Sequence, residues 1–387
     1  MKCKRAVALL LIFVLVLSVC PTVMAADEDL TLDCQGAILM DAQTGKVLYE
    51  SNADKKWYPA SMTKIMTLIL ALEAVRDGKA SMEEEVTASE YACSFGGTQV
   101  WLEPGEKFPL KQMLIAIAVG SANDCSVAVA EHLGGSEKGF AKMMTKRAKQ
   151  LGAKNTNFVN SHGLHDDNHY TTPYDLAQIS RYAITLPHML ELTSMKEYLF
   201  REDPKLVLHN TNKLLWWFEG TKGLKTGTTD KAKRNLTAVV DRDGLMLISV
   251  IMGAEGNRGH FTQSMSLQQY GFARYGYKQF YDKGHEIGEI QIGKGTRHSV
   301  KVVSKERVGT IIPKGEDEGM EVKIDLPKYV EAPVAKGQKV GSAVILKDGK
   351  KLGSIALVTV EDVGKGSLLS MLKKVGISVV SLNKVAL

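Results

Sequence analysis

The stretch PASMTK, residues 59–64, runs directly into the apolar segment IMTLILAL, residues 65–72. We interpret it as the first turn of a buried helix, because proline is tolerated at a helix start and the apolar run is too continuous for a surface helix. In such a helix Ser61 and Lys64 lie three residues apart, so their side chains share one face. A serine hydroxyl needs a base to become a strong nucleophile, and a lysine whose pKa is lowered by burial can be that base.

Ser-x-x-Lys by itself occurs by chance, in which case the serine caps a helix and the lysine is solvated. A second polar segment, SAND at residues 121–124, separates two apolar helices predicted over residues 110–119 and 125–133. Ser121 and Asn123 either cap the second helix or face a cleft, since an unpartnered polar group would be costly to bury at this point.

The third segment is GLKTGTT, residues 223–229. Two β-rich runs follow at residues 236–240 and 246–252, and the Asp243-Gly244 pair between them indicates a hairpin. Lys225-Thr226-Gly227 is therefore expected on or beside an edge strand, where a glycine often marks the close approach of a ligand or another backbone. The alternative is a surface strand with an ordinary lysine.

Composition excludes some functions. The chain has 387 residues and a net charge of +6, but no basic run interleaved with aromatic residues, so a nucleic-acid partner is not expected. His162, His165 and His169 match no metal-ligand spacing, so we predict polar loop histidines and no metal site. The cysteines past the N-terminus have neither metal-ligand spacing nor an accompanying histidine pattern, and we expect small buried residues.

The N-terminus predicts export. Residues 1–25 combine a basic start, an apolar stretch at residues 6–19 and small residues at the usual cleavage positions within residues 23–25, so we expect a signal peptide that is removed after Ala25. A lipid anchor on Cys20 or an uncleaved anchor helix are the alternatives, although the apolar stretch is short for a membrane span. An extracytoplasmic location follows from this prediction.

Three further regions are predicted. Residues 26–282 form the main domain, which ends in a helical pattern over residues 262–280. Residues 283–366 contain short alternating runs typical of a small all-β sandwich domain. Residues 367–387 have leucines at helical spacing with lysines between them, so this tail either contacts a membrane surface peripherally or packs on the β domain.

Taken together and in this order, the three segments resemble the triple signature of the penicillin-recognising serine acyl-enzymes. The further segments FVNSHGL (158–164) and HYTT (169–172) resemble the D-alanyl-D-alanine carboxypeptidases, which are low-molecular-mass penicillin-binding proteins. The resemblance runs from about residue 32 to residue 280 and, more loosely, through the β-rich domain. It implies an α/β (α+β) penicillin-binding/β-lactamase-like transpeptidase fold, with an antiparallel central sheet flanked by helices.

The resemblance also implies catalytic roles. Ser61 would be the nucleophile and Lys64 its general base, while Ser121 would relay the proton to the leaving D-alanine. The backbone N–H groups of Ser61 and Thr228 would form the oxyanion hole. No cofactor is implied.

For substrate binding, the resemblance implies that Asn123 holds the peptide amide and that Thr226 and Thr228 bind the terminal carboxylate. Lys225 and Gly227 belong to the same substrate-binding segment, and Lys225 would also assist Ser121 in the proton relay. An anionic substrate calls for a basic pocket, so Arg258, just past the strand 246–252, is predicted as a carboxylate anchor, with a solvated loop arginine as the alternative. The chain departs from the family at residues 233–235, where Lys-Arg-Asn replaces the usual glycine and aromatic residue. That departure affects the expected backbone path and substrate preference.

The implied function is a serine-type D-Ala-D-Ala carboxypeptidase that trims peptidoglycan stem pentapeptides in the cell wall and is acylated by β-lactams. A D,D-endopeptidase acting on cross-links would need the same residues. A catalytically silent penicillin-sensing or wall-binding module is a further alternative, which the intact signature argues against. A β-lactamase is disfavoured, because no Glu-x-x-x-Asn segment lies between Asn123 and Lys225.

Overall fold

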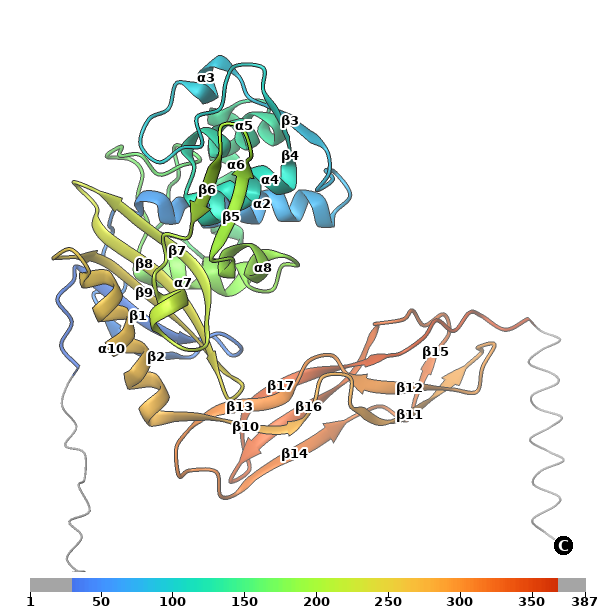
Figure 1. Cartoon of the computed structure of the whole chain (residues 1–387). Helices are drawn as coiled ribbons and strands as arrows, with labels where there is room; N and C mark the ends of the chain where they lie inside the picture. The colour runs from blue at the N-terminus through green and yellow to red at the C-terminus, as the bar shows by residue number, and fades with distance from the viewer. Residues whose placement is uncertain (1–29, 368–387) are drawn as a thin grey trace, which may run out of the picture. The chain divides into compact units, whose positions relative to one another are not determined.

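The computed structural model describes residues 30–367 (Figure 1). The predicted signal peptide and nearly all of the predicted C-terminal tail lie outside the described residues. Within residues 30–367, no helix is both long enough and apolar enough to cross a membrane.

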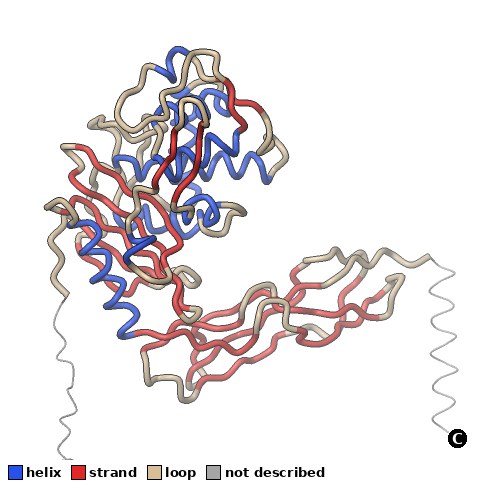
Figure 2. The backbone as a smooth tube through the Cα atoms, viewed as in Figure 1, coloured by secondary structure: helices blue, strands red, loops and turns tan. Residues whose placement is uncertain are grey.

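The main domain is built on a five-stranded antiparallel sheet with the strand order β2-β1-β9-β8-β7. Figure 2 colours the strands red and the helices blue. Its strands are β1 (Gly36–Asp41), β2 (Val47–Ser51), β7 (Thr221–Thr229), β8 (Lys233–Arg242) and β9 (Leu245–Ala254). The predicted antiparallel central sheet is confirmed. Lys225-Thr226-Gly227 lies on β7, which is an edge strand of the sheet as predicted.

Helices cover both faces of this sheet. Side chains of a strand alternate between the two faces, and β8 shows this directly. Leu236 and Ala238 belong to an apolar cluster with Phe261 of helix α10 (Gly259–Arg274), whereas Val239 belongs to the large core on the other face. Helix α7 (Pro173–Ala183) packs on β1 and β9. The predicted arrangement of a sheet flanked by helices is therefore confirmed.

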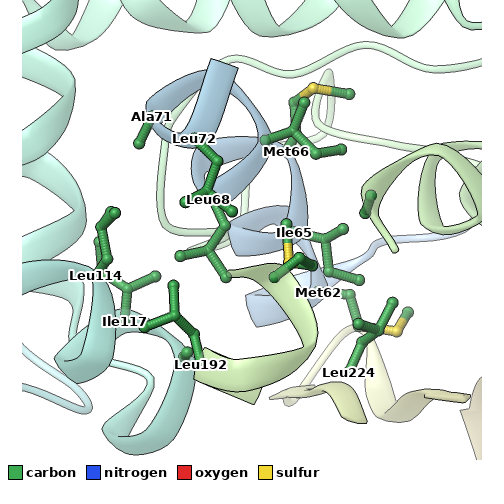
Figure 3. Packing of buried hydrophobic residues seen from close by; sticks show 14 of the residues in the cluster. Met62, Ile65, Met66, Leu68, Ala71, Leu72, Leu114, Ile117, Leu192 and Leu224 are labelled. Atoms are coloured by element: carbon green, nitrogen blue, oxygen red, sulfur yellow. The ribbon is translucent and has the colours of Figure 1, made fainter. Parts of the chain in front are cut away.

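The predicted helix after Pro59 is present, and its first turn is tighter than an α-helix. A 3-10 turn, η1 (Ala60–Thr63), leads into α2 (Lys64–Arg76). The apolar run of α2 is buried except for Leu70, which is half-buried, and Figure 3 shows Ile65, Leu68 and Leu72 packed within the core. Serine and lysine thus stand at the start of a largely buried helix.

The predicted break between two apolar helices is also present. Helix α4 (Leu110–Ile115) passes into a π-helical turn, η2 (Ala116–Gly120), and α5 (Asn123–Gly134) begins three residues after that turn ends. Ser121 at the break has a left-handed backbone, with φ of 62°. The remaining elements of this domain are β3 (Glu85–Thr87), α3 (Glu90–Cys93), β4 (Lys107–Pro109), α6 (Glu137–Gln150), α8 (Met189–Ser194), β5 (Glu197–Arg201), β6 (Leu206–His209) and α9 (Leu214–Trp217).

The C-terminal region is an all-β domain, as predicted. It contains a two-stranded sheet, β10-β13, and a six-stranded sheet with the order β14-β16-β17-β12-β11-β15. It has its own apolar core, which includes Val302, Ile345 and Leu357. Its strands are β10 (Tyr275–Tyr281), β11 (Glu286–Gly293), β12 (Ser299–Ser304), β13 (Val308–Pro313), β14 (Met320–Asp325), β15 (Tyr329–Glu331), β16 (Lys339–Lys347) and β17 (Lys350–Thr359).

The helix expected over residues 262–280 is wrong at its C-terminal end. Helix α10 stops at Arg274, and the next seven residues form β10, which pairs antiparallel with β13. Pairing with a strand more than 25 residues later decides the conformation here, and local periodicity does not show such a partner.

Candidate active site

A cleft of about 540 Å³ brings the three sequence segments together. Ser61 lies in η1, and residues 226–229 lie in β7. Ser121 lies at the break before α5, and Asn123 is the first residue of α5. Other residues that line the cleft are Thr98, Thr211, Lys213, Arg234, Asn257, His260 and Phe261. Ser61 and Thr229, which are 168 positions apart in the chain, therefore line one cavity.

The Lys64 amine is held at the base of this cleft by three oxygen atoms. Its side chain is fully buried, and Nζ lies 3.1 Å from Ser61 Oγ. Nζ also donates to Asn123 Oδ1 at 2.7 Å and to the His162 carbonyl oxygen at 2.8 Å. Both of these partner oxygens are acceptors only, so they take two of the hydrogens of the amine.

A neutral lysine amine has two N–H bonds and one lone pair. In the protonated amine the third hydrogen is donated to Ser61 Oγ; in the neutral amine, with both hydrogens directed at Asn123 and His162, the lone pair faces Ser61 Oγ, where a base must be to take the hydroxyl proton. Burial, together with the nearby charge of Lys225, lowers the pKa of Lys64 well below its usual value. The geometry around the Lys64 amine and its lowered pKa therefore both suit it to accept the Ser61 hydroxyl proton.

The π-helical turn places Ser121 at the cleft. Its left-handed backbone turns the chain sharply between two buried helices, and Thr98 Oγ1 fixes the turn by donating to the Ser121 carbonyl at 2.8 Å. Asn123 is engaged at both ends of its amide, because Oδ1 accepts from Lys64 and Nδ2 donates to the Gly96 carbonyl at 2.7 Å. One N–H of the Asn123 amide is left for another partner.

Strand β7 supplies a second buried amine. Burial lowers the pKa of Lys225 to about 7, and its Nζ lies 3.4 Å from Thr211 Oγ1. Thr226 donates its hydroxyl proton to the same Thr211 oxygen at 2.6 Å. Thr211 precedes β7 by ten residues, and sequence reasoning missed it because an isolated threonine in a loop carries no distinguishing signal.

Gly227 allows β7 to lie directly against the start of the Ser61 helix. A Cβ atom at this position would come within 2.5 Å of the Pro59 carbonyl oxygen and 3.0 Å of the Ser61 backbone nitrogen. Asn235 on β8 holds the same junction, since its Nδ2 donates to the carbonyls of Tyr58 and Pro59 at 2.9 and 3.2 Å. The polar Asn235 within an otherwise apolar strand was a signal that could have been used.

Two of the three loop histidines are buried, which their loop position did not indicate. His162 Nδ1 accepts from the Leu164 N–H at 3.0 Å, so its proton is on Nε2, 3.1 Å from Glu137 Oε1. Burial lowers the pKa of His162, which keeps the ring neutral. Glu137 also accepts from the N–H and the hydroxyl of Ser161. This network fixes the loop whose carbonyl holds Lys64. Within residues 30–367, no cluster of His, Cys, Asp or Glu could hold a metal ion.

Two arginines lie near the cleft in different situations. Arg258, the predicted carboxylate anchor, is exposed, lies outside the cleft lining, and has its guanidinium 5.2 Å from the Trp217 ring centroid. Arg234, in the segment where the chain departs from the family pattern, is partly buried and lines the cleft.

The fold and the cleft define a class of protein. A serine hydroxyl facing a buried amine, next to a second buried amine and the backbone of an edge strand, is the arrangement that serine hydrolases use. The antiparallel sheet with helices on both faces is the scaffold of that site, and every residue that lines the cleft belongs to this domain.

Comparisons with known proteins agree with this class. The family model described as D-alanyl-D-alanine carboxypeptidase, Peptidase S11, matches residues 22–256, and the model of the penicillin-binding protein 5 C-terminal domain matches residues 275–365. D-alanyl-D-alanine carboxypeptidase DacF of Bacillus subtilis is 36% identical over 379 residues, which cover 96% of this chain and 97% of the relative. DacA of Haemophilus influenzae is 34% identical over 348 residues, covering 88% of each chain.

Solved structures give the same result. Penicillin-binding protein 5 from Haemophilus influenzae superposes with a TM-score of 0.68 at 34% identity, over 87% of this chain and 99% of that one. The peptidoglycan synthesis regulatory factor PBP3 from Streptococcus pneumoniae gives a TM-score of 0.70 at 26% identity, over 86% and 100%. The chain belongs to the D-alanyl-D-alanine carboxypeptidase family and is a serine peptidase of that family.

Proposed function

We propose that this protein removes the terminal D-alanine from peptidoglycan stem pentapeptides through an acyl-enzyme on Ser61. The observation that carries the proposal is the Lys64 amine, whose two hydrogens are taken by Asn123 and His162 while Ser61 Oγ lies 3.1 Å away. An amine fixed in this way is prepared to accept one particular proton without reorganisation.

In the acylation step, Ser61 Oγ gives its proton to Lys64 Nζ and attacks the carbonyl carbon of the penultimate D-alanine. The backbone N–H groups of Ser61 and Thr228 stabilise the oxyanion that forms. The C–N bond of the peptide then breaks, and the proton passes through Ser121 to the leaving D-alanine nitrogen. Ser61 and Ser121 line the same cleft, which supports this path.

In the deacylation step, a water molecule gives a proton to Lys64 and attacks the ester carbonyl. The Ser61 oxygen leaves, takes back a proton and is regenerated, while the shortened peptide departs with a new carboxylate. A β-lactam ring presents its carbonyl to the same serine and would remain attached to it. Asn123, with one amide N–H unpaired in the described protein, would hold the amide of the acyl side of the substrate.

The site of action follows from the substrate. Stem peptides are outside the cytoplasm, which agrees with the signal peptide predicted at residues 1–25 and with a location at the cell wall or the outer face of the membrane. The predicted tail at residues 367–387 would add a peripheral membrane contact.

The test is to map the penicillin adduct by mass spectrometry and to measure D-alanine release from diacetyl-L-Lys-D-Ala-D-Ala. The wild type is expected to carry one penicilloyl group on Ser61 and to release D-alanine, and Ser61→Ala should do neither. Ser81→Ala removes an exposed hydroxyl from a turn that does not line the cleft and should behave like the wild type. An adduct on another residue, or labelling without any D-alanine release, would contradict the proposal.

A further inference from the structure

The cleft contains one arginine, and no role has been assigned to it. Arg234 lies in β8, directly opposite Thr228 of β7 in the antiparallel register. Side chains of directly opposed residues share a face of the sheet and start about 5 Å apart. The Arg234 side chain therefore starts next to that of Thr228 on β7, and Arg234 lines the cleft together with Thr228 and Thr229.

The Arg234 guanidinium has no acidic partner within residues 30–367. The neighbouring Lys233 is exposed and takes the nearby carboxylate, with its Nζ 3.8 Å from Glu255 Oε1. A partly buried cation in a cleft wall without a counter-ion is an unfavourable arrangement that a bound anion would relieve.

The other basic groups of the cleft are less suited to bind an anion. Burial lowers the pKa of Lys225 to about 7, so this amine carries only part of its charge at neutral pH. Burial and the charge of Arg234 lower the pKa of His260 to about 4, which leaves that ring neutral. Lys213 donates to the Asn210 carbonyl at 3.1 Å and lies 4.8 Å from the Trp216 ring centroid. An arginine keeps its charge at any pH at which the protein is folded.

Arg258 is placed differently. It is exposed at the start of α10, outside the cleft lining, with its guanidinium over Trp217. The segment 233–235, which differs from the expected family pattern, thus supplies a cation that lines the cleft, whereas Arg258 packs on an aromatic ring outside the cleft lining.

We propose that Arg234, rather than Arg258, binds the terminal carboxylate of the substrate and makes the enzyme selective for peptides with a free C-terminus. This inference rests on the proposed carboxypeptidase function. A guanidinium offers two parallel N–H donors to a carboxylate, beside the hydroxyl of Thr228. A substrate whose C-terminus is blocked as an amide would lose the charge that this arginine recognises.

The experiment compares D-alanine release from diacetyl-L-Lys-D-Ala-D-Ala with D-alaninamide release from the C-terminal amide of the same peptide. The wild type should prefer the free acid. Arg234→Ala should lower kcat/KM on the acid by about 10- to 100-fold, the usual effect of losing one hydrogen bond to a charged group, and should lower it less on the amide, so that the preference for the acid falls. Circular dichroism of each variant reports whether it is folded.

Arg234→Lys should restore part of the preference, because it keeps the charge without the paired donors. Lys233→Ala, which removes the adjacent exposed cation of the same strand, is the matched control and should keep the wild-type preference. Arg258→Ala should reduce the preference less than Arg234→Ala does.

An active wild type whose preference survives Arg234→Ala, or is abolished by Arg258→Ala instead, would overturn this inference alone. A wild type that hydrolyses neither peptide would overturn the proposed function and this inference with it.

Discussion

Gly227→Ala tests whether the contact between β7 and the nucleophile helix is required for catalysis. The added Cβ would lie 2.5 Å from the Pro59 carbonyl oxygen and 3.0 Å from the Ser61 backbone nitrogen. Both neighbours are backbone atoms, and Asn235 ties the Pro59 carbonyl to β8, so they have little freedom to move. The strand itself must shift.

The size of that shift follows from the contact. Ordinary van der Waals contact of a Cβ begins near 3.4 Å, so the oxygen contact is short by about 0.9 Å. An oxyanion-hole donor acts at about 2.7–3.1 Å from the oxyanion. Moving the adjacent Thr228 N–H by a comparable amount would remove that donor, and losing one such donor costs about 10²- to 10³-fold in kcat.

The assay is the second-order rate of penicillin acylation, together with D-alanine release from diacetyl-L-Lys-D-Ala-D-Ala. Gly353→Ala is the matched control, because this glycine also lies in a strand, β17, and a Cβ there would meet nothing within 4 Å. Gly353→Ala should retain wild-type rates. If folded Gly227→Ala is acylated within about threefold of the wild-type rate, the argument that glycine is required here is refuted.

The remaining predictions concern two charged residues, Lys225 and Glu137. Burial and the charge of Lys225 lower the pKa of Lys64, so Lys225→Ala should raise that pKa. In a plot of acylation rate against pH, the rising limb of this variant should therefore move to higher pH, whereas Lys222→Ala, which removes an exposed lysine, should leave the limb in place. A limb that does not move in Lys225→Ala would refute the electrostatic coupling of the two lysines. Burial alone would raise the pKa of Glu137, but its hydrogen bond to His162 and the other contacts lower it to about 2. Because the pKa of Glu137 is depressed in the folded protein, its ionised carboxylate stabilises the fold above pH 4.5, and this contribution is lost as the pH falls toward 2. The loss amounts to at most about 3 kcal/mol of the free energy of unfolding. Acid denaturation should show this pH-dependent loss in the wild type and not in Glu137→Gln. Glu137→Leu, which leaves buried donors unpaired, should lower the free energy of unfolding at pH 7 by about 3 kcal/mol more than Glu137→Gln, and equal stabilities in chemical denaturation would contradict this.

Several features followed from the sequence because their geometry is local. The spacing of Ser61 and Lys64 places them on one helical turn whatever surrounds the helix, and the Asp243-Gly244 turn determines the β8-β9 hairpin. The alternating runs after residue 283 determined an all-β domain. In each case, residues close together in the chain contain the whole signal.

Other features were decided by contacts between distant segments. The proposed role of Lys64 as a base depends on Asn123 and His162, 59 and 98 positions away, which accept hydrogen bonds from its amine, and on the surrounding core, which buries the side chain. Pairing with β13 turned the expected end of a helix into β10. The orientation of Arg234 toward the cleft depends on its register with Thr228. The sequence determined which groups are available for the chemistry, whereas the tertiary structure decided their protonation, direction and partners, because burial and long-range pairing are properties of the folded chain.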